Sequence, residues 1–208
     1  MPLNRDPLLL HPILATHLEG IIQAISKKLP RGIEAKMISA YRSPAEQFEL
    51  FKKGRHFVNG IWVKKPGGAT VTNIDGFRKK SNHNYLPCVA IDIGLFSGNQ
   101  YLTNSPHYKH VHAGAKAYGL EWGGNWKKFV DQPHIEIPVE LLFQKDRILD
   151  EAVQWQRYLK MAGTYAGELD GAFGKKSTAA LKATTGNEVR TTAAWKKLVN
   201  KYGLLPPF

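Results

Sequence analysis

Cysteine, long apolar runs and acidic residues are all scarce in this chain. Cys88 is the only cysteine among 208 residues, which excludes an internal disulfide and is compatible with a reducing compartment. No run of about 18 apolar residues occurs, so neither a spanning helix nor stable membrane insertion is expected. Residues 1–28 lack a basic start, an unbroken apolar centre and a small-residue cleavage site, so no signal peptide is expected.

Acidic residues are few relative to basic ones. The chain has 17 Asp and Glu against 29 Lys and Arg, a formal net charge of +12. Such an excess implies an anionic partner, whether nucleic acid, a membrane surface or a phosphate-rich cell envelope. No helix-turn-helix, RNA-recognition or zinc-finger pattern is present, so nucleic acid is not expected. Hydrophobic residues make up 43% of the chain, as in globular proteins, so a folded core is expected.

Helical and strand patterns are mixed along the first two thirds of the chain. Apolar residues at helical spacing, a Ser43-Pro44 helix start and alternating apolar residues mark the elements. We expect helices over 7–29, from 43 to about 53 and over 108–118, and strands over 33–40, 89–95 and 134–137. The Gly-, Lys- and Asn-rich stretch 54–82 is interpreted as a long surface loop. Because no βαβ repeat is present, the predicted fold class is α+β.

The hydrophobic pattern changes near residues 142–151, where a charged helix is predicted to begin. The rest of the chain has its own large apolar side chains, namely Trp155, Tyr158, Leu159, Phe173, Leu181, Trp195 and Leu198. About 58 residues suffice for a minimal three-helix core. We therefore expect two domains, residues 1–145 and residues 146–208, the second all-helical.

Three residues supply the protein ligands that a catalytic zinc site needs, with a fourth position left for water. They are His83, Asp92 and His134. Asp131 stands shortly before His134, and Pro133 between them predicts a loop that leads into a strand. This loop would place a carboxylate beside the metal. Spacing alone does not identify the site, because a lone histidine is more often structural than a ligand.

A set of motifs, in the same order along the chain, resembles a known group of zinc peptidases. The motifs are Lys65–Asn73, Ser81–Tyr85, Ala90–Asp92, Trp122–Trp126 and Asp131–His134. Together they resemble the phage-endolysin L-alanyl-D-glutamate endopeptidases, which belong with the D-alanyl-D-alanine carboxypeptidases of the vancomycin-resistance type. The resemblance covers roughly residues 33–138. It implies a zinc DD-peptidase/Hedgehog-like catalytic domain, a Zn²⁺ cofactor and bacterial peptidoglycan as the substrate.

The same resemblance implies a role for each residue of the site. His83, Asp92 and His134 match the zinc ligands, and Asp131 matches the catalytic base. Arg42 matches the arginine that binds substrate and stabilises the oxyanion. These roles agree with the physical chemistry, since Zn²⁺ acidifies water, a carboxylate accepts the released proton and a cation stabilises charge on the scissile carbonyl oxygen.

Other residues compete for these roles. The interval between His83 and Asp92 is longer than is usual in the family and contains Cys88. This cysteine is interpreted as a small buried residue, although a ligand or a nucleophile is the alternative. Glu136 competes with Asp131 as the base, or orients a ligand. A second cluster of histidines is interpreted as part of a solvent-exposed helix face. It consists of His107, His110 and His112.

Three further residues are candidates for substrate contact. Trp122 and Trp126 would line the peptide cleft, with core packing as the alternative. Ser81 would bond substrate or cap a turn.

The end of the chain resembles a wall-binding module. Residues 156–180 are similar to the three-helix peptidoglycan-binding module found beside many wall hydrolases, although the aromatic-glutamine pair expected near Ala183-Thr184 is missing. Tyr165 and Asp170 are candidate glycan contacts. The alternative is that the segment 170–174 forms only a tight turn between helices.

These observations predict an endolysin that hydrolyses the L-alanyl-D-glutamate bond of peptidoglycan stems and so lyses the cell wall. The alternatives are a D-alanyl-D-alanine carboxypeptidase and a wall-binding protein without catalytic activity. We expect a monomer that is made in the host cytoplasm and acts on the wall or periplasm after release.

Overall fold

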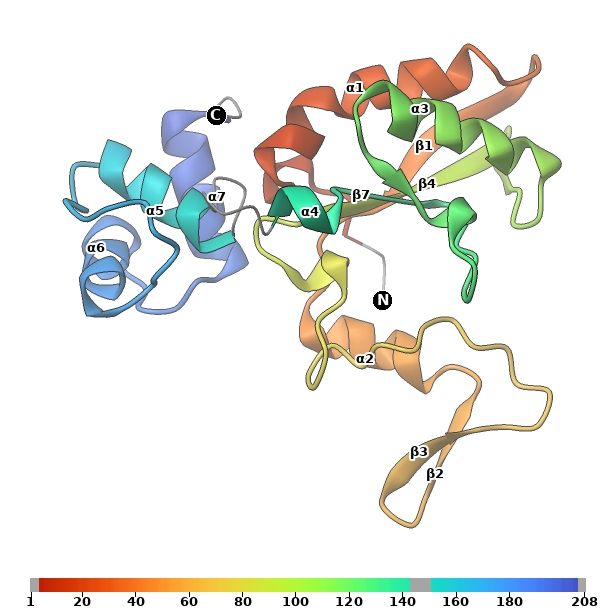
Figure 1. The fold of residues 1–208 in the computed structure, drawn as a ribbon, viewed down its shortest axis with the longest axis horizontal. Helices are drawn as coiled ribbons and strands as arrows, with labels where there is room; N and C mark the ends of the chain where they lie inside the picture. Colours follow the sequence, from red (N-terminus) through yellow and green to blue (C-terminus); the bar gives the residue numbers. More distant parts are fainter. Residues whose placement is uncertain (1–3, 143–150, 206–208) are drawn as a thin grey trace.

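An antiparallel sheet forms the centre of the larger part of the chain in the computed structural model, which describes residues 4–142 and 151–205 (Figure 1). The strand order is β1 (Ile33–Ser39), β4 (Ala90–Ser97), β7 (His134–Glu136) and β6 (Glu121–Trp122), and β5 (Gln100–Tyr101) pairs with β4. Helices α1 (Pro12–Ser26) and α3 (Val111–Ala117) cover one face of this sheet. The predicted α+β class is confirmed.

Strand β4 packs its apolar side chains against the two covering helices. Ile91, Ile93 and Leu95 are fully buried in the core that α1 and α3 complete. Side chains alternate between the faces of a strand, so Asp92 lies on the opposite face. The register places Asp92 directly across from His134 on β7 and from Ser39 on β1. Directly opposed residues have Cβ atoms roughly 4.5–5.5 Å apart, so the pairing brings two predicted ligands together.

The first helices begin where proline and capping residues place them. The predicted helix over 7–29 is divided into a 3-10 helix, η1 (Pro7–Leu9), and α1, which starts at Pro12. A proline lacks an amide donor and is tolerated in the first turn of a helix, so Pro12 begins a helix and does not continue one. Helix α2 (Pro44–Lys52) begins at the predicted position, where Ser43 and Glu46 form a capping box.

The predicted surface loop over 54–82 is partly wrong, because it contains a hairpin. Strands β2 (Arg55–Val58) and β3 (Ile61–Lys64) pair across Asn59 and Gly60, which have φ values of 48° and 82°. Positive φ at both central residues is the geometry of a type I′ turn, whose twist matches that of the flanking strands. The Asn-Gly pair was the sequence signal for this turn.

The remaining short elements connect these units. The 3-10 helices are η2 (Asn82–Asn84), η3 (Pro106–His110) and η4 (Gly123–Asn125), and α4 (Val139–Leu142) follows β7. The helix predicted over 108–118 is therefore η3 followed by α3. Within 4–142 and 151–205, every helix is too short or too polar to cross a membrane.

Three helices at the end of the chain pack around two tryptophans. We call α5 (Glu151–Met161), α6 (Lys175–Thr185) and α7 (Thr192–Tyr202) the helical unit. The fully buried rings of Trp155 and Trp195 lie 5.0 Å apart at its centre. The predicted helix start near 142–151 falls mostly outside the described residues, and the boundary between residues 145 and 146 stays a prediction.

The core of the helical unit includes residues from the first part of the chain. Leu9 and Leu86 are buried among the apolar side chains of its three helices. The indole N–H of Trp155 donates to the carbonyl of Leu86 (2.6 Å), and that of Trp195 donates to the carbonyl of Leu8 (2.8 Å). The two parts of the chain therefore share a buried, hydrogen-bonded interface.

Glu151 adds charged contacts to this interface. Its carboxylate lies 3.2 Å from Arg190 and 3.5 Å from Lys80, and it accepts a hydrogen bond from the backbone N–H of Leu86. The two ends of the segment 80–86 are thus held by one side chain of the helical unit.

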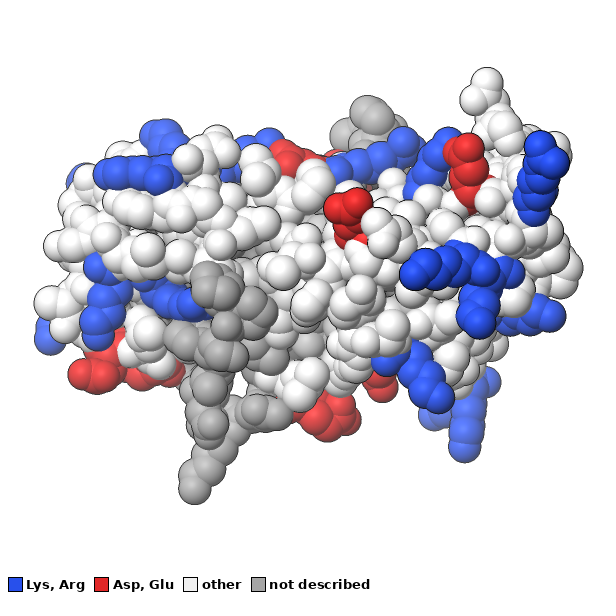
Figure 2. Space-filling model, turned by 90° about the horizontal axis from the view of Figure 1, so that it is seen from above, with Lys and Arg blue, Asp and Glu red and all other residues white. Residues whose placement is uncertain are grey.

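Basic side chains are spread over both parts of the molecule. On the face seen from above, over α1 and α3, lysines and arginines are scattered and do not form a single patch (Figure 2). The net positive charge is therefore not a property of one basic tail.

Candidate active site

Three buried side chains converge where β4, β7 and η2 meet. The Nε2 atom of His83, the Oδ1 atom of Asp92 and the Nδ1 atom of His134 lie 3.2 Å from one another in each pair. Tetrahedral zinc with bonds of about 2.0–2.1 Å has ligand atoms about 3.3–3.4 Å apart. The donor set therefore fits one metal ion. It is the one group of three His, Cys, Asp or Glu side chains in the described parts of the chain that could hold a metal.

Hydrogen bonds fix the tautomers of both histidines. The Nδ1 atom of His83 lies 2.7 Å from the carbonyl oxygen of Ala40, which only accepts, so Nδ1 carries the proton. The Nε2 atom of His134 lies 2.7 Å from a carboxylate oxygen of Glu136 and donates to it. Nε2 of His83 therefore presents a lone pair to the common point, and Nδ1 of His134 does so once it has lost its proton. Partners of this kind orient metal-binding histidines and make them more basic.

Arg42 holds the second oxygen of Asp92. Its Nη2 donates to Oδ2 of Asp92, and its Nε donates to the hydroxyl of Ser39 (3.0 Å). Burial opposes ionisation of Asp92, but His83 and Arg42 outweigh it and hold the pKa of this carboxyl well below its usual value. The carboxylate is therefore charged, and its Oδ1 faces the two histidine nitrogens.

The two histidines differ in their protonation. Burial lowers the pKa of His83, so this ring is neutral at pH 7. Burial also acts to lower the pKa of His134, but hydrogen bonds to Asp92 and Glu136 outweigh it and raise that pKa to about 9. In the metal-free chain His134 is thus an imidazolium between two carboxylates.

Asp131 lies beside this group, on the loop before β7. Its backbone N–H donates to the carbonyl of Gly123 (3.0 Å), and its own carbonyl accepts from the N–H of His134 (3.2 Å). A Cβ at position 123 would lie 2.6 Å from the Asp131 carbonyl oxygen, so this approach requires glycine. Burial and the charge of Asp92 raise the pKa of Asp131. A carboxylate with a raised pKa is a better proton acceptor.

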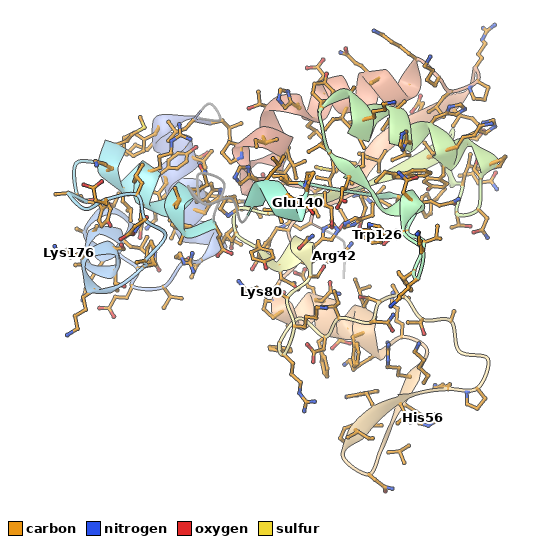
Figure 3. All side chains as sticks on the ribbon, in the orientation of Figure 1. Arg42, His56, Lys80, Trp126, Glu140 and Lys176 are labelled. Carbon is orange, nitrogen blue, oxygen red and sulfur yellow. The ribbon has the colours of Figure 1, made fainter. Side chains whose placement is uncertain are left out.

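A cleft of about 710 Å³ opens over these residues. One wall comes from the sheet and the loop 126–134, and the other from α2 and residues 71–74 and 79–80. Arg42 and Trp126 both line it and point into the space between the sheet and α2 (Figure 3). The Trp126 ring lies 4.9 Å from that of His134. Trp126 therefore forms part of the cleft wall next to His134, and its contact with substrate stays a prediction.

The other predicted substrate contacts are placed differently. Ser81 lines the cleft and also caps η2, where its hydroxyl accepts from the N–H of His83 (3.4 Å). Trp122 is not among the residues that line the cleft. Its indole donates to the carbonyl of Gln132 (2.7 Å), so it holds the loop that carries Asp131.

Two polar side chains of the cleft were not predicted from the sequence. Asn82 donates to Glu136 (2.6 Å) and so positions the partner of His134. Gln47 is 1% exposed and donates to Thr72 (3.2 Å) and to the carbonyl of Ile74 (3.0 Å), which ties α2 to the opposite wall. Asn82 stands next to a predicted ligand in the Ser81–Tyr85 motif, and this position could have indicated a role in the site. No sequence motif indicated such a role for Gln47.

The competing residues do not form a second site. Cys88 is fully buried, its thiol donates to the carbonyl of Ala90 (3.0 Å), and burial raises its pKa to about 12. It is therefore neither a nucleophile nor a metal ligand. The rings of His107 and His110 stack at 6.1 Å, whereas His112 lies beside Asn125.

Tyr165 and Asp170 belong to one network in the helical unit. The amide of Gln156 donates to the hydroxyl of Tyr165 (3.1 Å) and to the carboxylate of Asp170 (2.8 Å). Tyr165 is 7% exposed, whereas Asp170 is exposed. The network holds the turn between α5 and α6, and glycan contact by either residue stays a prediction.

The chain is similar in sequence to known peptidases. The family described as D-alanyl-D-alanine carboxypeptidase matches residues 75–137, a span that contains the three converging side chains and Asp131. The chain is 33% identical to the peptidoglycan L-alanyl-D-glutamate endopeptidase CwlK of Bacillus subtilis (strain 168) over 149 residues, which is 66% of this chain and 77% of CwlK. The crystal structure of the Serratia marcescens L-Ala D-Glu endopeptidase ChiX matches 64% of this chain and 84% of ChiX, with 20% identity and a TM-score of 0.41. Given its identity to CwlK over most of that protein, the chain belongs to the D-alanyl-D-alanine carboxypeptidase family of zinc peptidases.

Proposed function

We propose that this protein is a zinc endopeptidase that hydrolyses the L-alanyl-D-glutamate bond of peptidoglycan stem peptides. The observation that carries the proposal is the triangle of donor atoms from His83, Asp92 and His134, with the acid Asp131 beside it in an open cleft. The specificity is supported by CwlK, a relative named for this bond.

The chain's own residues would divide the reaction as follows. Bound zinc would polarise the scissile carbonyl and acidify the attacking water. His83, Asp92 and His134 would hold the ion, and Asp131 would take the proton from the water and pass it to the leaving amine. Arg42 would keep Asp92 charged and offer its guanidinium to the carbonyl oxygen as that oxygen becomes negative.

Glu136 would act as a positioning residue in this scheme. Exchange of Glu136 for Gln should weaken zinc binding or activity by about 10–100-fold, the usual effect of losing a carboxylate behind a metal-bound histidine. The effect should stay in this range because the glutamine oxygen can still accept from His134. Zinc affinity and the kcat for a soluble stem peptide at saturating zinc would be measured together. Unchanged affinity with a much larger loss of kcat would contradict the positioning role.

Zinc binding should tighten as pH rises. A metal can occupy Nδ1 of His134 only after its proton leaves, and the pKa of this ring is about 9. The apparent affinity should therefore rise by about tenfold per pH unit from about pH 6 and level off near pH 9. Competition with a chromophoric chelator over this range measures the effect. A flat profile would contradict the protonated state of His134.

The bond itself can be tested on purified sacculi. After digestion, new amino termini are labelled and identified, and new N-terminal D-glutamate supports the endopeptidase. Free D-alanine without a new glutamyl terminus would support the second candidate, a D-alanyl-D-alanine carboxypeptidase, which the description of the matching family favours. If neither product appears although the protein binds zinc and sacculi, the remaining reading is a wall-binding protein without catalytic activity.

The helical unit would hold the enzyme on its substrate. Its resemblance to peptidoglycan-binding modules and its exposed Asp170 support a wall-binding role. Tethering of this kind raises the local concentration of a catalytic site. The protein would work as a monomer at the cell wall.

A further inference from the structure

The β2–β3 hairpin carries a concentration of exposed apolar side chains. It projects from the molecule, away from the sheet and the helical unit (Figure 1). Of the ten large hydrophobic side chains that are exposed in the described residues, five lie on the hairpin and the loop after it, namely Phe57, Val58, Ile61, Val71 and Phe77. Single exposed apolar residues are normal, but a cluster of them marks an interaction surface.

The tip of the hairpin is a compact apolar end. Val58 and Ile61 face each other across the type I′ turn, and Ile61 is 59% exposed. Phe57 is 60% exposed and its ring lies 5.3 Å from that of Trp62. Trp62 meets the ring of Phe48 on α2 edge-on at 6.1 Å, which fixes the base of the hairpin to the body. Asn59 is the one polar side chain in the turn.

The surrounding segment is strongly cationic. Residues 52–80 contain eight Lys and Arg and a single acid, Asp75, which gives +7 of the +12 formal charge of the whole chain. Several of the basic side chains are exposed, namely Lys53, Lys64, Lys65, Arg78 and Lys79. The segment that carries the apolar tip is therefore rich in exposed positive charge.

The tip of the hairpin is separate from the catalytic cleft, although Val71 and Lys79 of the following loop line the cleft as well. The cleft wall uses Leu50 of α2 and then Val71–Ile74, and none of the residues 51–70 lines it. The chemistry in the cleft therefore does not account for the exposed apolar tip.

We propose that the hairpin docks the protein on an anionic phospholipid surface. Val58 and Ile61 would enter the boundary between headgroups and acyl chains, Trp62 would lie at headgroup level, and the lysines would meet the phosphates. A polysaccharide fits less well, because sugar hydroxyls pressed against aliphatic side chains lose hydrogen bonds to water without replacement. The docking is peripheral and reversible, so no spanning helix is needed.

Sedimentation of the full-length protein with vesicles tests this proposal. Vesicles of phosphatidylglycerol and phosphatidylethanolamine should bind the protein at low salt and release it as salt rises, whereas phosphatidylcholine vesicles should not bind it. The double variant Val58→Asn, Ile61→Asn should bind about tenfold more weakly or worse. Val189→Asn is the matched control, since Val189 is 69% exposed and lies on the helical unit side of the chain.

A second variant keeps the test independent of the fold of the hairpin. Lys64→Gln, Lys65→Gln should also weaken binding to the anionic vesicles and should reduce its dependence on salt. Hydrolysis of a soluble stem peptide should be the same in all these variants. Absence of wild-type binding to anionic vesicles, or equal binding by the tip variant, overturns the proposal. Loss of sacculus binding with vesicle binding retained would assign the hairpin to the wall instead.

Discussion

Asp131→Asn should lower the kcat for a soluble stem peptide by roughly 10²–10⁴-fold, the usual cost of losing a general base. Asparagine has nearly the shape of aspartate but cannot accept the proton of the attacking water. The backbone bonds that hold this loop, from Asp131 to Gly123 and from His134 to Asp131, do not involve the side chain. Zinc content and melting temperature should therefore match those of the wild type.

Glu136→Gln is the control for this experiment, because Glu136 lies in the same cleft and is also a carboxylate. Asp131→Asn should lose more of its kcat than Glu136→Gln. If Glu136→Gln lost more activity while its fold and metal content stayed intact, Glu136 would be the base and Asp131 would be a supporting residue.

His83→Ala and His134→Ala should each reduce bound zinc from one ion per chain to a small fraction and should abolish hydrolysis. Each variant removes one of only three protein ligands, so the remaining two donors hold the ion far more weakly. Each substitution also removes a contact to the Oδ1 atom of Asp92, because both histidines lie 3.2 Å from that atom. Elemental analysis of the purified, folded variants gives the zinc content directly.

His107→Ala serves as the matched control, because this histidine stacks on His110 and lies outside the triangle. Its zinc content should equal that of the wild type. Normal zinc content in both His83→Ala and His134→Ala would contradict the assignment of the metal site, regardless of their activity.

The converging residues could be found from the sequence because each stands in a local motif. Asp92 lies on the polar side of an alternating strand, and His134 follows a proline that forces an extended approach. The strand pairing that sets them opposite each other is a tertiary contact that neither motif encodes, and the resemblance supplied the link between them. The roles of Asp131 and Arg42 rest on resemblance and stay predictions.

The parts that were missed depend on contacts between distant segments. Gln47 on α2 donates hydrogen bonds to residues 72 and 74, and no local sequence pattern encodes such a partner.

The hairpin was missed for a different reason. Its strands are four residues each and partly exposed, so their alternation is weak, although Asn59-Gly60 is a strong turn signal. The hydrophobic pattern also could not show that Leu9 and Leu86 pack with the helical unit.

That shared interface limits how freely the two parts can be exchanged with those of other lytic enzymes. A chimera with a foreign tail would leave the Leu86 carbonyl without the Trp155 indole and would expose Leu9 and Leu86 to water. It would also release Lys80 from Glu151, at the start of the segment that carries His83. A graft should therefore carry over the surface around Leu8, Leu9 and Leu86 together with the three helices, and the natural unit of exchange is larger than the helices alone.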